Sequence, residues 1–206
     1  MEVNAELKAY VEGEIIPLYD NFDKGHRRDH VNTVIAQALE LSRYYPVDVN
    51  MIYAAAAFHD TGLCKGREAH HTESARIIRA DVNLPRWFSN EQIEIIADAA
   101  EDHRASAKRE PRTIYGKIVA EADRIIVPET IILRAIQYSV SNFPEYSREE
   151  HWVRTSGHIK DKYAEGGYLK LWIPESPNAG RLQDLHKLIA DEAALRQVFD
   201  RLYDKL

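Results

Sequence analysis

The sequence has very little cysteine, no long apolar run and no excess of basic residues. Its single cysteine, Cys64, cannot form an internal disulfide and fits a reducing compartment. The longest apolar stretch, residues 51–58, is far too short to span a bilayer. The first residues, Met1-Glu-Val-Asn-Ala-Glu6, lack the basic start and the apolar middle of a signal peptide. We therefore expect a cytoplasmic protein with no membrane partner.

The charge balance narrows the classes of partner. Acidic residues outnumber basic ones by 33 to 27, and the formal net charge is −6. Nucleic-acid binders need a basic field that displaces counterions from phosphates, so nucleic acid is not expected as a partner, whereas nucleotides remain candidate ligands. With 206 residues, 45% of them hydrophobic, the chain is long enough for one well-buried core. We expect one domain over residues 1–206.

Apolar residues recur at helical spacing along most of the chain, which predicts an all-α protein. Two expected helices begin with capping boxes, Ser89-Asn-Glu-Gln92 and Ser147-Arg-Glu-Glu150. Asp29, Asp48 and Thr72, or a residue near Thr72, are the expected N-caps of three others. The expected helices run over residues 2–19, 29–45, 49–58, from about 72, 89–102, 113–126, 129–141, 147–163 and 181–206.

One nearly all-apolar helix ends in the ionisable pair His59-Asp60. Unpaired polar groups at the inner end of a buried helix are costly, and a metal ion removes that cost, because imidazole and carboxylate are ordinary ligands for Zn, Mn or Fe. His30 lies on the rim of an earlier apolar face, and Asp123 lies on the apolar side of a later helix. Each residue alone also has a structural interpretation, as a hydrogen-bonded, capping or salt-bridged side chain.

The order of His30, then His59-Asp60, then Asp123, on separate helices, resembles the HD-domain superfamily of metal-dependent phosphohydrolases. Three tracts look like the motif contexts of that family: His30-Val-Asn-Thr-Val34, Ala57-Phe-His-Asp-Thr-Gly62 and Ala120-Glu-Ala-Asp-Arg-Ile125. The resemblance covers residues 26–124. It implies an HD-domain helical bundle with a core over about 20–127 and a C-terminal helical extension over about 128–206, and a divalent metal ion bound by His30, His59, Asp60 and Asp123.

The resemblance also implies a second metal ion in some branches of the family. A histidine that precedes a small residue carries over to His70 or His71, which come before Ser74-Ala75. We favour His70, and a surface histidine pair is the alternative. His103 ends an apolar stripe, as His59 does, and matches a further histidine of the two-metal branches. Asp60 would bridge the ions, and the sequence does not choose among Mn, Fe, Zn, Co, Ni and Mg or between one ion and two.

The resemblance implies that a metal-activated water hydrolyses phosphoesters of nucleotides or related small molecules, with Asp60 as the catalytic residue. Lys65 and Arg67, in the loop after the motif, are candidates to bind the substrate phosphate. Arg104 is another, in a basic loop that also contains Lys108, Arg109 and Arg112. The alternative is that these cations are solvated.

The sequence departs from known branches of the HD superfamily, and these differences limit which branch it can be assigned to. Leu63 stands where some two-metal phosphodiesterases have a lysine, their Gly-Tyr-Pro signature is missing, and the first carboxylate after the motif is Glu68, so the general acid is unassigned. The ligand pattern with four histidines also looks like the HD-type di-iron oxygenases, and a third hypothesis is a non-catalytic nucleotide-sensing HD domain. Residues 168–173, an aromatic tract, are assigned to core packing, with pocket closure or a homodimer contact as alternatives.

Overall fold

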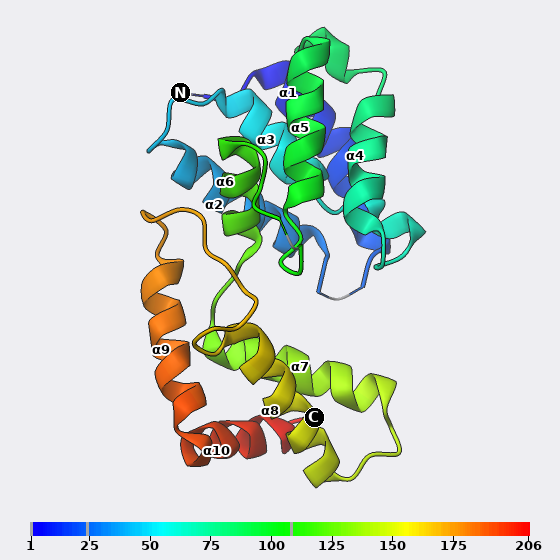
Figure 1. Cartoon of the computed structure of the whole chain (residues 1–206). Coiled ribbons are helices and arrows are strands. Elements are labelled where there is room, and N and C mark those ends of the chain that lie inside the picture. The colour runs from blue at the N-terminus through cyan, green and yellow to red at the C-terminus, as the bar shows by residue number, and fades with distance from the viewer. Residues whose placement is uncertain (1, 24, 108) are drawn as a thin grey trace. The chain divides into compact units, whose positions relative to one another are not determined.

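A computed structural model describes residues 2–23, 25–107 and 109–206 of the chain. All regular structure in these residues is helical, so the predicted all-α fold is confirmed (Figure 1). The chain forms two compact units: the first runs to Arg124 and includes Trp172–Ser176, and the second comprises Ile125–Leu171 and Pro177–Leu206. Across the described residues, no helix combines the length and the apolar character that a bilayer crossing requires.

The first unit is built around the apolar helix α3 (Val49–Phe58), in which every residue from Met51 onwards is buried. α3 packs against α2, α5 and α6, and α4 packs against α5 (Figure 1). Burial on all sides explains why this helix carries almost no polar residue. The other α-helices of the unit are α1 (Ala5–Tyr10), α2 (Arg28–Ser42), α4 (His70–Ala80), α5 (Asn90–Asp102) and α6 (Ile114–Asp123).

The N-terminal segment is a continuous series of helical turns. After α1 come a π-helical turn, η1 (Val11–Ile15), and a 3-10 helix, η2 (Ile16–Asn21). The sequence also predicts that the helix expected over residues 2–19 ends near Pro17. That end is wrong, because Pro17 occupies the first turn of η2, where its missing N–H costs nothing. The helical path therefore continues to Asn21 and brings Tyr19 into the core, with no exposed surface.

Both capping boxes are confirmed. The hydroxyl of Ser89 accepts the backbone N–H of Gln92, the side chain of Gln92 accepts the N–H of Ser89, and Ser147 and Glu150 make the same exchange at the start of α8. Such a cap supplies partners for two N–H groups that the first helical turn leaves unpaired.

Of the three single-residue caps that the sequence predicts, Asp48 is confirmed, because its side chain accepts the N–H of Asn50 at 2.8 Å at the start of α3, and the other two are wrong. α2 begins at Arg28, so Asp29 lies inside the first turn, where its negative charge interacts favourably with the helix dipole instead of capping it. α4 begins at His70, and the hydroxyl of Thr72 donates to the carbonyl of Ala69 at 2.9 Å. A first-turn acid and an N-cap residue have similar sequence signatures, and neither tract has the reciprocal partner of a capping box.

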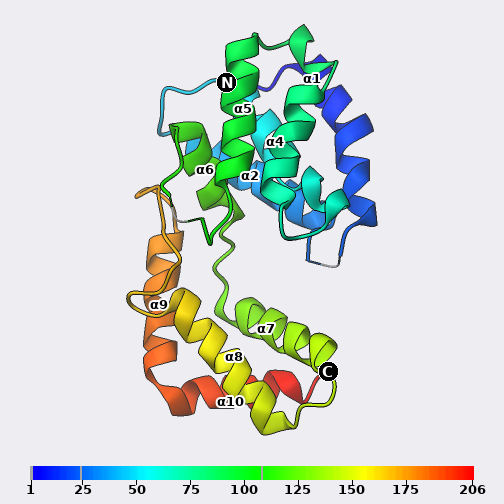
Figure 2. The ribbon, with the colours of Figure 1, turned by 45° about the vertical axis from the view of Figure 1, so that its right-hand side comes forward.

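The second unit is a small helical bundle. Helices α7, α8 and α10 pack against one another, and α9 packs against α8 and α10 (Figures 1 and 2). The predicted single helix over 181–206 is wrong: it is interrupted at Asp191, whose side chain caps the following helix by accepting the N–H of Ala194 at 2.9 Å. The bounds are α7 (Pro128–Asn142), α8 (Arg148–Tyr163), α9 (Asn178–Ala190) and α10 (Glu192–Tyr203).

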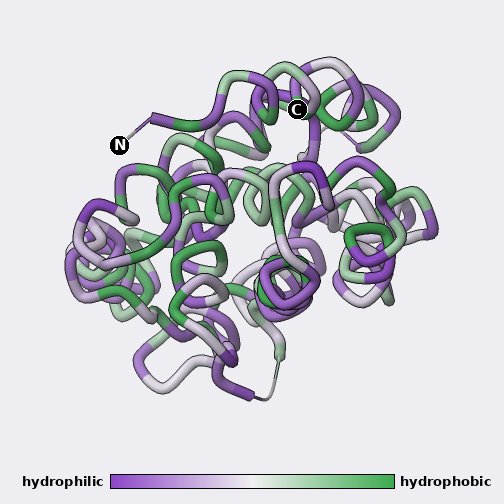
Figure 3. The backbone as a smooth tube through the Cα atoms, turned by 90° about the horizontal axis from the view of Figure 1, so that it is seen from above, coloured by the Kyte–Doolittle hydropathy of each residue, from purple (hydrophilic) through white to green (hydrophobic). Residues whose placement is uncertain are grey.

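Hydrophobic and hydrophilic stretches alternate within the helical turns of the chain, as Figure 3 shows. This alternation is the structural counterpart of the three- and four-residue apolar spacing in the sequence. Residues 172–176, which we call the strap, also combine buried and exposed residues, although they form no helix. Ile173 is 2% exposed and packs in the core of the first unit, and the backbone N–H of Trp172 donates to Glu121 Oε2 at 2.7 Å.

Candidate metal centre

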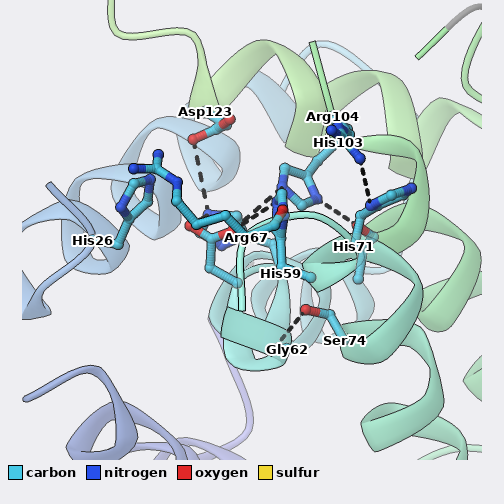
Figure 4. Close-up of polar contacts among 12 residues, drawn as sticks. His26, His59, Gly62, Arg67, His71, Ser74, His103, Arg104 and Asp123 are labelled. Atoms are coloured by element: carbon cyan, nitrogen blue, oxygen red, sulfur yellow. Dashed lines mark hydrogen bonds and ion pairs between the residues drawn. The ribbon is translucent and has the colours of Figure 1, made fainter. Parts of the chain in front are cut away.

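Six predicted ligands converge at one point in the first unit. Each lies at or beside a helix end: in the first turn of α2, directly after α3, at the first residue of α4, directly after α5 and at the last residue of α6 (Figure 4). The residues are His30, His59, Asp60, His70, His103 and Asp123. Helix ends suit this purpose, because a side chain there can turn inward without the packing constraints of the helix middle.

The first group consists of His30, His59 and Asp123, and we call it the His30 group. His30 Nε2 lies 3.3 Å from His59 Nε2 and 3.3 Å from Asp123 Oδ1. One oxygen of Asp60, Oδ2, completes this side at 3.5 Å from His30 Nε2 and 3.2 Å from His59 Nε2. His59 is fully buried, and His30 and Asp60 are nearly so.

The second group consists of His70 and His103, and we call it the His70 group. Their Nε2 atoms are 3.2 Å apart, and both face the other oxygen of Asp60, Oδ1, at 3.5 Å and 3.4 Å respectively. The carboxylate of Asp60 therefore stands between two sets of donors and turns one oxygen to each. This is the arrangement of a carboxylate that bridges two metal ions.

Backbone carbonyls orient three of the four imidazoles. In each case Nδ1 lies within hydrogen-bond distance of the carbonyl three residues earlier, which fixes the ring and leaves Nε2 for a metal. The pairs are His59 with Ala56, His70 with Arg67, and His103 with Ala100. Nδ1 of His30 is buried and has no hydrogen-bond partner among the described residues.

The electrostatics of the cluster fit a bound cation. Burial lowers the pKa of His30, but the carboxylates of Asp123 and Asp60 outweigh it and raise the pKa to about 9. Burial also opposes ionisation of Asp123 and Asp60, yet the nearby imidazoles hold both pKa values well below the ordinary value. At His70, burial and the charge of His103 lower the pKa to about 4. Buried carboxylates that remain ionised need positive charge beside them, and a nitrogen and oxygen donor set of this kind suits Zn, Mn or Fe.

Of the two adjacent histidines, His70 belongs to the cluster and His71 does not. The ring of His71 turns instead toward Arg104, whose Nη1 lies 3.4 Å from His71 Nδ1 and donates to the carbonyl of Glu68 at 2.6 Å (Figure 4). Burial and the neighbouring charge of Arg104 lower the pKa of His71. His71 and Arg104 thus form a pair beside the His70 group.

The other predicted phosphate-binding cations lie on the surface. Arg67 is exposed, lies 3.6 Å from Asp23 Oδ2, and extends toward His26 in front of the His30 group (Figure 4). Lys65 is exposed at the end of the 3-10 helix η3 (Thr61–Lys65), and no ion pair in the described residues joins it to the cluster. Their predicted contact with substrate stays a prediction.

The rest of the basic loop is neutralised by the acidic end of α5. Arg109 and Arg112 both donate to the buried carboxylate of Asp102, and Arg112 adds a bond to Glu101 at 3.0 Å. Both arginines are exposed, as the solvated alternative expects, and they pair with these carboxylates. Lys108 lies outside the described residues. Among the cations of this loop that the structure describes, Arg104 alone contacts a residue next to the cluster.

Sequence reasoning missed one residue that contacts the motif, Tyr19. Its hydroxyl bonds the backbone on both sides of His59, at Ala57 and at Asp60. Tyr19 sits in an apolar repeat that predicts only core packing, and about 40 residues separate it from its partners, so no local pattern reveals the contact.

Comparison with known proteins identifies the fold and the family. The sequence model of the HD domain matches residues 27–127. A crystal structure described as a predicted HD superfamily hydrolase, from an uncultured Thermotogales bacterium, is similar with a TM-score of 0.50 and 21% identity over 75% of this chain and 86% of that one. No curated protein matches the sequence. Residues 27–127 therefore form an HD domain, and the solved structure agrees with this fold.

Proposed function

We propose that the protein is a metal-dependent phosphohydrolase that cleaves phosphoester bonds of nucleotides or related small molecules. The single observation that carries the proposal is the position of Asp60, with Oδ2 facing the His30 group and Oδ1 facing the His70 group at 3.2–3.5 Å. A binding site for one ion needs only one of these groups. Two groups that share a carboxylate support a site for two divalent ions, held by all six residues.

Metal ions held by these residues would supply a Lewis acid and activate a water for attack on phosphorus near neutral pH. The chain's own residues have three tasks. The four imidazoles and two carboxylates hold the site and fix its geometry, through the backbone bonds to Nδ1 described above. The helix ends around the cluster exclude bulk water from His59 and His103, which are at most 3% exposed.

The third task is recognition of the phosphate. Arg104 is the candidate the structure favours, because its backbone anchor at Glu68 holds the guanidinium beside the His70 group. Its Nη2 makes no hydrogen bond within the described residues and is open to a phosphate oxygen. Arg67 supplies a second, exposed charge on the side of the His30 group.

The test combines elemental analysis with a screen of nucleotides and simple phosphoesters, using Asp60→Ala as the control. We expect the wild-type protein to contain divalent metal and to release phosphate or a nucleoside product, and we expect Asp60→Ala to lose both the bound metal and the activity. A fully active Asp60→Ala variant would remove the mechanism.

A second candidate function, dioxygen chemistry at a di-iron centre, is favoured by the convergence of four histidines and two carboxylates. This ligand set resembles that of the HD-type di-iron oxygenases. Protein purified without added metal distinguishes the two functions. A coupled di-iron spectrum with oxygen uptake supports the oxygenase, and colourless protein with manganese-stimulated phosphate release supports the hydrolase.

A further inference from the structure

The last turn of α3 is closed by side chains. Three consecutive backbone carbonyls at this helix end each receive a hydrogen bond from a different side chain, as the last carbonyls of a helix require. They are Ala56 from His59 Nδ1 at 2.8 Å, Ala57 from the Tyr19 hydroxyl at 2.9 Å, and Phe58 from Thr61 Oγ1 at 2.8 Å. Two of these donors belong to the motif itself, but Tyr19 comes from η2, before the segment that the HD-domain model matches.

The phenol of Tyr19 also reaches past the helix end. While its O–H donates to the carbonyl of Ala57, its oxygen accepts the backbone N–H of Asp60 at 3.3 Å. A hydroxyl can do both at once. One side chain thus fixes the backbone immediately before and immediately after His59.

The surroundings of Tyr19 leave it no second arrangement. The side chain is fully buried, and its ring packs edge-on against Phe22 at 5.1 Å and lies 6.4 Å from the ring of His59. Water does not reach the phenol, so the carbonyl of Ala57 and the N–H of Asp60 would lose their partner if the hydroxyl were absent.

We propose that Tyr19 is a positioning residue of the metal centre, whose hydroxyl holds the turn that aims His59 and Asp60 at the two ligand groups. The inference rests on the proposed function in that it assigns Tyr19 a role at the same site. It also makes the N-terminal segment part of the working centre, although this segment lies outside the matched domain. Outer contacts that orient ligands affect metal affinity by about 10- to 100-fold when they are removed.

The test compares Tyr19→Phe with Tyr53→Phe in the full-length protein. Tyr53 is a buried tyrosine of α3 that makes no hydrogen bond within the described residues, so its variant controls for loss of a phenol from the same core. For Tyr19→Phe we expect Mn²⁺ to bind about tenfold more weakly in calorimetric titration and the amide of Asp60 to exchange at least tenfold faster in metal-free protein. We expect kcat to fall with KM unchanged, and Tyr53→Phe to match the wild type in all three.

A Tyr19→Phe variant that loses thermal stability but keeps wild-type Mn²⁺ affinity and Asp60 exchange would show a packing role only and overturn the proposal. Ser89→Ala, which removes a helix cap in the same unit, indicates how much a loss of stability alone changes these readouts. Failure of the proposed function looks different, because wild-type protein would then bind no divalent metal or would bind metal without releasing phosphate. In that case the exchange of the Asp60 amide still decides whether Tyr19 fixes the turn.

Discussion

Gly62 lies directly against the backbone of His70: a Cβ atom at Gly62 would come within 2.0 Å of the His70 carbonyl oxygen. The N–H of Gly62 also donates to Ser74 Oγ at 2.9 Å, so the motif turn and α4 are in contact at their backbones (Figure 4). This approach sets where His70 stands relative to Asp60. Only glycine fits, because the atoms it meets belong to the main chain and cannot rotate away.

Gly62→Ala is therefore expected to destabilise the protein and to weaken the second metal position. Overpacking usually costs about 1–3 kcal/mol, and the backbone contact puts this site at the upper end. The measurement is chemical denaturation together with metal content. Gly13→Ala is the control, because a Cβ there meets nothing within 4 Å. Equal stability of the two variants would contradict the close approach.

Because the two ligand groups are separate, we expect a substitution in each group to remove a different metal ion. His103→Gln removes a donor of the His70 group and should leave one ion per chain, whereas Asp123→Asn weakens the His30 group and should spare the ion near His70. Elemental analysis of each purified variant beside the wild type measures the stoichiometry. Two ions retained in His103→Gln would mean that His103 is a buried core histidine and not a ligand.

Arg104→Gln tests phosphate recognition. A charge-assisted hydrogen bond to phosphate contributes about 1.5–3 kcal/mol, so kcat/KM for p-nitrophenyl phosphate should fall about tenfold or more. Arg109→Gln is the matched control from the same loop, since Arg109 pairs with Glu101 and Asp102. If the two variants lose the same activity, the loop acts through its fold and not through Arg104.

The stability of the second unit should depend on pH through His158. Partial desolvation of the His158 ring, which stays exposed, and the charges of Lys162 and Arg154 lower the pKa of His158 below its ordinary value of 6.5. The unfolded chain therefore takes up this proton first, and stability falls as the pH drops from above 6.5 toward the lower folded pKa. His158→Gln should reduce that pH dependence in thermal unfolding, and an unchanged slope would show that other groups cause it.

Patterns within one helix were predictable from the sequence. The capping boxes at Ser89 and Ser147 each need residues only three positions apart, and both are found. Periodicity likewise placed the apolar helix that ends at His59, because an all-apolar helix is buried wherever it packs. The sequence did not predict the helix break at Asp191, because the apolar spacing continues across it. Only the side-chain cap at the start of α10 marks the interruption.

The convergence of His30, His59, Asp60 and Asp123 was predicted from a resemblance, since spacing cannot show that separate helices meet. The sequence favoured His70 over His71 as the ligand but did not exclude His71. The choice depends on which way α4 turns after Ala69, and that direction is set by the contact with Gly62. Tyr19 could not be found at all, because its role depends on a packing contact between distant segments. The role of the six residues as ligands stays a prediction that metal analysis decides.

The strap limits how this protein can be shortened or recombined. Besides the hydrogen bond of Trp172 and the core packing of Ile173, the hydroxyl of Tyr45 donates to Glu175 Oε2 at 2.6 Å, so the strap is held at several points. A chain cut at residue 127 would uncover the apolar surface that Ile173 now shields and would leave Glu121 without its Trp172 donor. Any transplant of the HD domain into another scaffold must therefore carry a short, distant length of sequence with it.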